Sequence, residues 1–407
     1  MLNKILFLVA LISFIAALIY APKLLRVYKM INLYEQDKIA YNFINMDKVF
    51  QIGPVIPASK ESFAFNTQEF ELPQTYFFDG QVRNLIDALD YYETDGLIVL
   101  NNDTILYENY WHNNDRSSQH ISWSVAKSFL SALIGIAIER GQIESINDPI
   151  TKYLKDFSNS GYNNVSVKNL LQMSSGIKFN EDYSDYNSDI NRFGRTISFG
   201  TSMRDFAKSL ENEKPQGTYN HYVSIDTQML AMLLEEVTGK SITDNLKEDI
   251  WHKIGMEHDA YYMIDNTGME VALGGLNASL RDYAKFGLLY LNRGFWEGES
   301  IVPAEWVDAS HAIDEDHLKP GENSNSSSTW GYGYQWFWPL WPTLQKISPI
   351  AGMALTAIGL NVYVARFIGI RRSSHLGLGV IAINCVWLFL TIGSANLNML
   401  TISMSAT

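Results

Sequence analysis

The sequence predicts a mixed α/β fold, and three observations lead to this fold class. Residues 96–100 and 104–108 are largely apolar runs that flank a polar Asn-Asn-Asp turn, which predicts a β-hairpin. Residues 129–138 form a longer run that is apolar on every face, which predicts a buried helix. Residues 227–238 and 279–292 follow with patterns that predict two further helices.

The N-terminus predicts a membrane segment that lies outside the globular fold. Residues 5–21 are almost entirely apolar and follow Lys4, which is typical of a signal peptide or a short membrane anchor. Because no A-x-A cleavage site ends the run, we expect an uncleaved anchor or transmembrane segment over residues 1–26. Residues 27–80 show no strong periodicity, and we expect them to lead from the membrane to the fold.

The composition limits the classes of function. The chain of 407 residues carries a formal net charge of −13, which argues against a nucleic-acid partner. Cys385 is the single cysteine, so the chain has no internal disulfide and no cysteine-rich metal site. The eight histidines show no H-E-x-x-H or similar spacing. We therefore expect neither a metal nor a cofactor.

Two stretches stand out by their composition. Residues 180–191 are acidic and rich in tyrosine, which predicts an exposed loop, either simply solvated or bordering a pocket. No Asp or Glu follows Glu322, although the chain carries 44 acidic residues. Within residues 341–407, the apolar stretches 347–365 and 376–395 are compatible with membrane helices, with the final strands and helix of the fold, or with an aberrant terminus.

The clearest chemical signal lies at Ser124. Ser124 and Lys127 form an S-x-x-K pattern at the first turn of the predicted apolar helix, so their side chains share one face. A lysine in a pocket with little water can have its pKa lowered enough to take the serine proton. The helix start also offers free N–H groups to an oxyanion. A second match, from Ser175 to Lys178, contains Gly176 in a turn-like stretch, and we expect no site there.

Several motifs in order resemble the serine β-lactamase and penicillin-binding superfamily, in the class C-type branch of esterases and 6-aminohexanoate-dimer hydrolases. The family motif S-x-x-K is matched by Ser124 and Lys127, and the Y-x-N motif is matched at Tyr222, with Ser224 in place of Asn. The third motif, K-T-G or a variant, is not found, and residues 356–359 are the nearest candidate. Four more segments resemble the family: 147–154 (NDPITKYL), 167–176 (VKNLLQMSSG), 274–287 (GGLNASLRDYAKFG) and 330–336 (WGYGYQW).

This resemblance implies both a fold and a chemistry. The implied fold is an antiparallel sheet flanked by helices, with a helical second region, in a hydrolase domain over residues 81–340. Ser124 would form an acyl-enzyme, with Lys127 and Tyr222 as general base and acid, and Tyr219 is the competing tyrosine. The implied substrates are small esters or amides, and the serine that replaces asparagine makes a β-lactam a less expected substrate.

The family also implies a location and leaves one alternative function open. Its members suggest that the domain lies on the extracytoplasmic, periplasmic side of the membrane. The alternative is a membrane-tethered penicillin-binding or sensor module, which would be acylated on Ser124 without turning over.

Overall fold

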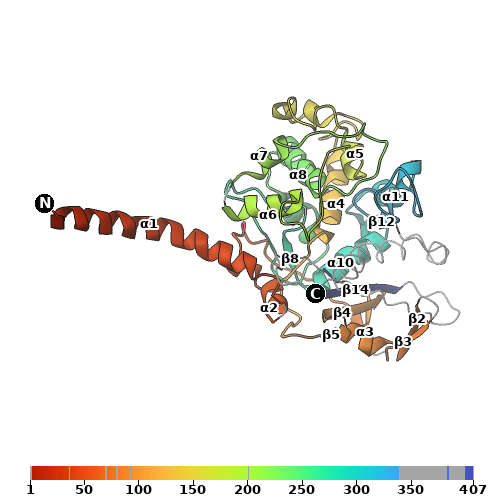
Figure 1. Ribbon diagram of the computed structural model, residues 1–407. Helices are drawn as coiled ribbons and strands as arrows, with labels where there is room; N and C mark the ends of the chain where they lie inside the picture. Colours follow the sequence, from red (N-terminus) through yellow and green to blue (C-terminus); the bar gives the residue numbers. More distant parts are fainter. Residues whose placement is uncertain are drawn as a thin grey trace.

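The computed structural model describes residues 2–35, 37–68, 71–78, 81–91, 93–199, 201–338, 383–384 and 399–406. Figure 1 shows a layer of helices above a β-sheet, with α10 (Leu280–Leu291) lying against the sheet and helix α1 projecting from the body. The mixed α/β fold predicted from the sequence is confirmed.

The central sheet has five strands in the order β1–β5–β4–β14–β13. β4 (Thr94–Asn101) and β5 (Thr104–Tyr110) form the predicted antiparallel hairpin. β14 (Met399–Ala406) lies antiparallel to β4, so the two ends of the globular fold share one sheet. β13 (Ile383–Asn384) pairs with β14, and β1 (Asn66–Thr67) runs parallel to β5 at the other edge.

Strand β4 is buried on both faces. Successive strand side chains point to opposite faces of a sheet. Leu97 and Val99 pack with α3 (Leu85–Tyr91) on one face. Ile98 and Leu100 belong to the main hydrophobic core on the face that α10 covers. This double burial explains why the strand reads as a continuous apolar run in the sequence.

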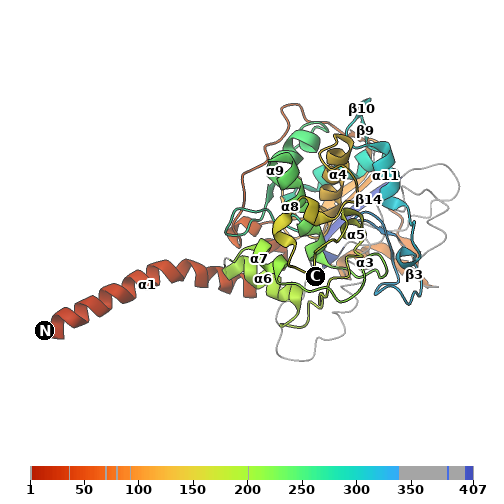
Figure 2. The same cartoon turned by 90° about the horizontal axis from the view of Figure 1, so that it is seen from above.

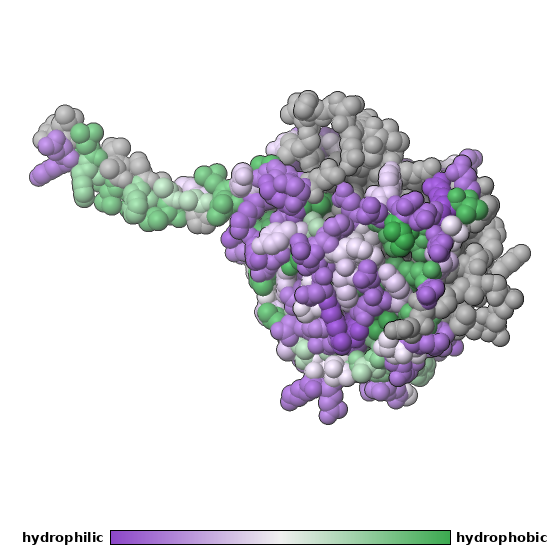
Figure 3. All heavy atoms as spheres, turned by 90° about the horizontal axis from the view of Figure 1, so that it is seen from below, coloured by the Kyte–Doolittle hydropathy of each residue, from purple (hydrophilic) through white to green (hydrophobic). Residues whose placement is uncertain are grey.

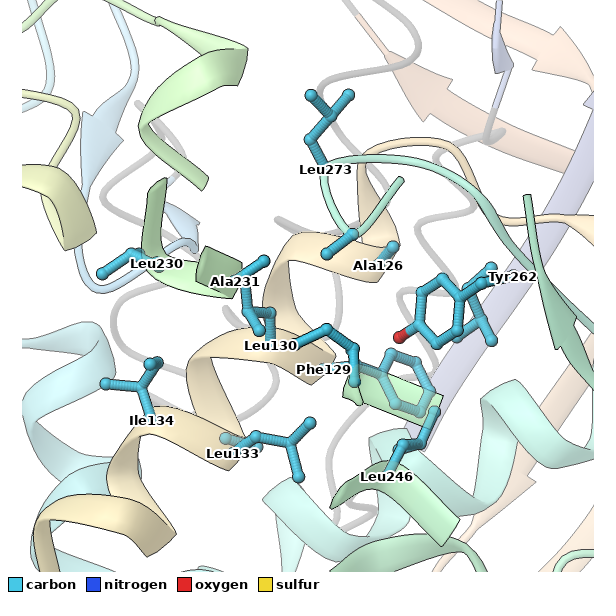
Figure 4. Close-up of a cluster of buried hydrophobic side chains, with 14 of the residues drawn as sticks. Ala126, Phe129, Leu130, Leu133, Ile134, Leu230, Ala231, Leu246, Tyr262 and Leu273 are labelled. Carbon is cyan, nitrogen blue, oxygen red and sulfur yellow. The ribbon is translucent and has the colours of Figure 1, made fainter. Parts of the chain in front are cut away.

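The helical layer is built around α4 (Val125–Glu139), which is the predicted apolar helix. It packs against α8 (Ser224–Thr238), which in turn packs against α5 (Val167–Leu171). Figure 4 shows side chains of α4 and α8 in one buried cluster, including Leu130 and Leu230. The catalytic candidates therefore lie on a rigid, fully packed scaffold.

Helix α4 also makes a close approach to α11 (Ala304–His311) at Gly135. A Cβ atom on Gly135 would lie 2.4 Å from Cγ of Trp306, a distance that no real contact allows. A glycine is required here because the tryptophan ring rests directly on the helix backbone.

The remaining elements connect these layers. The short helices and helical turns are α2 (Ile39–Phe43), α6 (Asp189–Phe199), α7 (Met203–Lys208), α9 (Ile242–Leu246), η1 (Met46–Lys48), η2 (Ile150–Lys152), η3 (Lys155–Phe157), η4 (Lys247–Trp251) and η5 (Asp316–Leu318). The small sheets pair β2 (Thr75–Phe78) with β3 (Gln81–Asn84), β9 (Phe295–Trp296) with β10 (Glu299–Ser300), β11 (Gly331–Tyr332) with β12 (Phe337–Trp338), and β8 (Leu276–Ala278) with both β6 (His120–Ile121) and β7 (Tyr261–Tyr262).

The N-terminal segment forms helix α1 (Leu2–Ile31), which extends away from the body in Figures 1 and 2. Its side chains Phe7, Ile12 and Leu18 are exposed, and the described part of the helix is largely hydrophobic in Figure 3. The C-terminal end of α1 contacts α6, where the Ser198 hydroxyl donates a hydrogen bond to the Met30 sulfur.

Across the residues whose placement is described, no helix is both long enough and apolar enough for a membrane crossing. The membrane segment predicted for residues 1–26 is therefore not supported. The extracytoplasmic location stays a prediction.

The C-terminal region is described in two short pieces. Residues 399–406 form β14 and contribute to the central sheet, which is one of the alternatives that the sequence leaves open. The apolar stretch 347–365, most of the stretch 376–395, and the candidate third motif at residues 356–359 lie outside the described residues.

Candidate active site

Ser124 lies at a sharp turn between β6 and α4. The Ser122 N–H donates a 2.8 Å hydrogen bond to the Leu276 carbonyl and so ties this segment to β8. Trp123 then adopts a positive φ of 43°, which is a strained conformation for a residue other than glycine. Ser124 follows as the N-cap of α4, so its side chain lies at the positive end of a buried helix.

Lys127 lies one helical turn after Ser124, and its side chain is buried with 2% exposure. Its Nζ lies 3.4 Å from Ser124 Oγ and also donates to the Leu273 carbonyl. Burial lowers the pKa of Lys127 to about 8, while the nearby Glu181 carboxylate acts in the opposite direction. A substantial fraction of the amine is therefore neutral at slightly alkaline pH and able to accept a proton.

Tyr222 lies just before α8 and reaches the same serine. Its hydroxyl donates a 3.1 Å hydrogen bond to Ser124 Oγ, and its ring centroid lies 5.5 Å from Lys127 Nζ. The ring stacks on Phe337 at 5.4 Å, which fixes its orientation. Burial, together with the Glu181 charge, raises the pKa of Tyr222 well above its ordinary value, so the phenol keeps its proton at neutral pH.

The structure brings together the three site residues predicted from the sequence. Ser124 and Lys127 come from α4, and Tyr222 comes from the segment that leads into α8. The competing candidate Tyr219 is placed differently, because its ring lies against the Lys214 ammonium at 3.1 Å. The geometry therefore favours Tyr222, the tyrosine that matches the family motif, over Tyr219.

Glu181 is a neighbour of the site that sequence reasoning missed. Its carboxylate accepts hydrogen bonds from the Ser224 hydroxyl at 2.6 Å and from the Tyr183 hydroxyl at 2.8 Å. Its charge adds to the raised pKa of Tyr222 and offsets part of the lowering that burial causes in the pKa of Lys127. The serine in place of the family's asparagine was the available signal, since Ser224 is the residue that holds Glu181.

A cavity of about 380 Å³ opens beside Ser124 and Lys127. Tyr183 and Tyr186 line it, so the acidic, tyrosine-rich stretch 180–191 borders a pocket, the second of the two possibilities that the sequence allows. Tyr34 also lines the cavity, and its ring lies 6.2 Å from the ring of Trp123. The size is in the range that holds a small organic ligand.

The described residues contain no group of three or more His, Cys, Asp or Glu side chains that could hold a metal ion. A serine with a neutral amine and a neutral phenol within reach can attack a carbonyl, pass its proton on, and return it to a leaving group.

Comparisons with known proteins identify the family to which this arrangement is similar. The family model described as β-lactamase matches residues 82–381. The 6-aminohexanoate-dimer hydrolase of Paenarthrobacter ureafaciens is 28% identical over 270 residues, which are 64% of this chain and 67% of that protein. The teichoic acid D-alanine hydrolase of Staphylococcus aureus is 28% identical over 140 residues, which are 34% of this chain and 31% of that protein.

Solved structures agree on the fold. A Bacillus anthracis protein assigned as a 6-aminohexanoate-dimer hydrolase superposes with a TM-score of 0.68 at 24% identity, covering 76% of this chain and 82% of that one. EstCE1, a hydrolase with promiscuous acyltransferase activity, superposes with a TM-score of 0.51 at 14% identity, covering 64% and 82%. At these identities the similarity shows a common fold.

Proposed function

This chain belongs to the β-lactamase family, and we propose that it is a serine hydrolase that cleaves small esters or amides through an acyl-enzyme on Ser124. One observation carries the proposal, namely the convergence of two proton-transfer groups on one hydroxyl. Lys127 Nζ lies 3.4 Å and the Tyr222 hydroxyl 3.1 Å from Ser124 Oγ. Two curated relatives are named as a 6-aminohexanoate-dimer hydrolase and a teichoic acid D-alanine hydrolase, which supports hydrolysis as the class of reaction.

In the first half-reaction, Ser124 Oγ attacks the substrate carbonyl while neutral Lys127 accepts the serine proton. A pKa of about 8 suits Lys127 to this role, because a base works best when its pKa lies near the working pH. The oxyanion forms at the N-terminus of α4, where the positive end of the helix dipole and the backbone N–H of Ser124 stabilise negative charge.

The tetrahedral intermediate then collapses and the ester or amide bond breaks. The Tyr222 phenol donates its proton to the departing oxygen or nitrogen and regains a proton from Lys127. The raised pKa of Tyr222 supports this direction of transfer, because the phenol holds its proton until the leaving group needs it. In the second half-reaction, water attacks the acyl-Ser124 ester, and the same two groups carry the water proton to Ser124.

The residue at position 224 favours esters and linear amides over β-lactams. The family's asparagine amide is replaced by the Ser224 hydroxyl, which donates to the Glu181 carboxylate at 2.6 Å and so does not stand free for a substrate. The Glu181 carboxylate also places a negative charge near the reacting groups, which opposes the binding of an anionic β-lactam.

The proposal is tested by incubating the protein with a fluorophosphonate probe and mapping the adduct by peptide mass, then following intact mass with p-nitrophenyl acetate. We expect the probe on Ser124 and only a transient acetyl adduct during steady turnover. A probe adduct on another residue would contradict the assignment of Ser124 as the nucleophile. An acetyl adduct on Ser124 that persists without turnover would instead support the acylated sensor module.

A further inference from the structure

The walls of the cavity beside Ser124 are largely apolar, and two helices contribute apolar side chains to one side of it. Val27, Met30 and Ile31 line it from the end of α1, and Ile190, Phe193 and Ile197 line it from α6. These helices are in contact, and Figure 2 shows the end of α1 beside α6. Ser124 therefore lies on one side of the cavity, and the N-terminal helix contributes to its hydrophobic wall.

The charged side chains that line the cavity already have partners within the protein. Lys127 contacts Ser124 and the Leu273 carbonyl. Arg195 is held by Tyr186, since its Nη1 donates to the Tyr186 carbonyl at 2.6 Å and its guanidinium lies 4.1 Å from the Tyr186 ring. Among the described residues that line the cavity there is no Asp or Glu. A substrate ammonium such as a linear amino-acid dimer carries would find no carboxylate on these walls.

We propose that this cavity binds the acyl chain of the substrate, and that the chain is an unbranched aliphatic one of about six to ten carbons. The inference rests on the proposed hydrolase function and names its substrate class. A cavity of about 380 Å³ lies in the range of roughly 300–1,000 Å³ that is usual for small-ligand sites, and its apolar lining suits a medium-length acyl chain. The carbonyl carbon would lie at Ser124, and the chain would run between α1 and α6.

The physical reason is the transfer of methylene groups from water to an apolar wall. Each methylene that enters the cavity contributes binding in the transition state, so kcat/KM rises by about fourfold per carbon until the cavity is full. The first test measures p-nitrophenyl esters from acetate to dodecanoate. Octanoate has six more carbons than acetate, so we expect a rise of about 10³-fold or more from acetate to octanoate and a fall beyond decanoate.

A second series separates the acyl side of the substrate from the alcohol side. Ethyl to octyl acetates keep the acyl group constant and lengthen the leaving group. We expect kcat/KM to change by less than about threefold in this series. A steep rise with the alcohol chain and a flat acyl series would overturn the proposal, because the cavity would then hold the leaving group.

Gly194 of α6 provides a variant that fills the cavity. A Cβ atom built on Gly194 meets nothing within 4 Å, and the residue lines the cavity. We expect Gly194→Leu to lower the ratio of octanoate to acetate kcat/KM by at least about tenfold. Thr196→Leu is the matched control, because it adds a leucine to the same helix at a position outside the cavity lining, and it should leave the ratio unchanged.

A binding measurement keeps this inference separate from the hydrolase proposal. Ser124→Ala protein is titrated with octanamide and with acetamide, and the melting temperature is followed. We expect octanamide to raise the melting temperature of the Ser124→Ala protein and acetamide to leave it unchanged. Adding Gly194→Leu to the same protein should remove the rise caused by octanamide. If octanamide binds to the Ser124→Ala protein but the native protein cleaves no ester, the acyl-chain cavity is supported and the hydrolase proposal is wrong. If neither rates nor binding depend on acyl length, the inference is wrong.

Discussion

The chain contains the S-x-x-K pattern twice, and the two copies differ in every physical respect that matters for chemistry. At residues 124–127 the pattern lies on the first turn of a helix, and the serine and lysine share one face. At residues 175–178 the chain turns at Gly176, which has a φ of 77°, and does not continue as a helix. The same residue types at the same spacing are therefore brought together in one region and separated in the other.

The environment of each lysine completes the contrast. Lys127 is buried, and its pKa is lowered to about 8. Lys178 is exposed to solvent. Ser175 is buried at 1% exposure, accepts a hydrogen bond from the Ile177 N–H, and contacts the Asp226 carboxyl. The second serine thus stabilises a turn, whereas the first has an amine and a phenol directed at its oxygen.

The largest difference between the two regions should appear when each serine is removed. Ser124→Ala is expected to lower kcat for p-nitrophenyl ester hydrolysis by about 10⁴-fold or more, because the acyl-enzyme cannot form. Ser175→Ala should keep the activity and lower the free energy of unfolding by about 1–2 kcal/mol, because a buried hydrogen bond is lost. Steady-state rates and denaturant unfolding check both values. Equal loss of activity in the two variants would contradict the distinction.

The two lysines should differ almost as strongly. Lys127→Met removes the proposed base, and we expect kcat to fall by about 10³-fold. Lys178→Met replaces an exposed side chain and should change stability by less than about 0.5 kcal/mol and leave kcat unchanged. Ester hydrolysis assays on both variants make the comparison. A Lys127→Met protein that folds and turns over at the native rate would remove Lys127 from the mechanism.

A smaller effect is expected at the two tyrosines near residue 220. Tyr222→Phe removes the hydroxyl that donates to Ser124 Oγ, and we expect kcat to fall by about 10²-fold. Tyr219→Phe keeps the ring that lies over Lys214 and should leave kcat unchanged. The loss should be larger for amide than for activated ester substrates, because an amide nitrogen needs a proton to leave. If Tyr222→Phe lowered ester hydrolysis more than amide hydrolysis, the proton donor to the leaving group would be a residue other than Tyr222.

The smallest expected change in activity comes from pH. Lys127 must be neutral to act as a base, and its pKa is about 8, so kcat/KM should rise about tenfold per pH unit below pH 8 and level off above it. Circular dichroism over the same range serves as the control for folding. A profile that is flat between pH 6 and 9 would show that a different group accepts the serine proton.

Much of the fold was predictable from the sequence because it depends on local patterns. The hairpin of β4 and β5 was predictable from two apolar runs around a polar turn. The helix α4 was predictable from its long apolar run, and the shared face of Ser124 and Lys127 follows from helix geometry. The role assigned to Tyr222 needed the family resemblance, since one tyrosine among 22 carries little information by itself.

Other features could not be predicted because they join distant parts of the chain. The Glu181 carboxylate reaches the site only through Ser224, which is 43 residues away. The Leu273 carbonyl accepts from Lys127 across 146 residues. The apolar run at the N-terminus suggested a membrane segment, whereas the structure places the end of that helix on the wall of the cavity.

By itself, the sequence determined the mixed α/β class, the buried helix and the pair of residues at its first turn, because backbone geometry sets which neighbours on a helix share a face. Only the tertiary structure decided which of the two S-x-x-K serines accepts a hydrogen bond from a tyrosine hydroxyl and which of the two lysines is buried away from water. The physical reason is that desolvation, and with it the pKa of Lys127, depends on the segments that pack around a side chain and not on its neighbours in sequence.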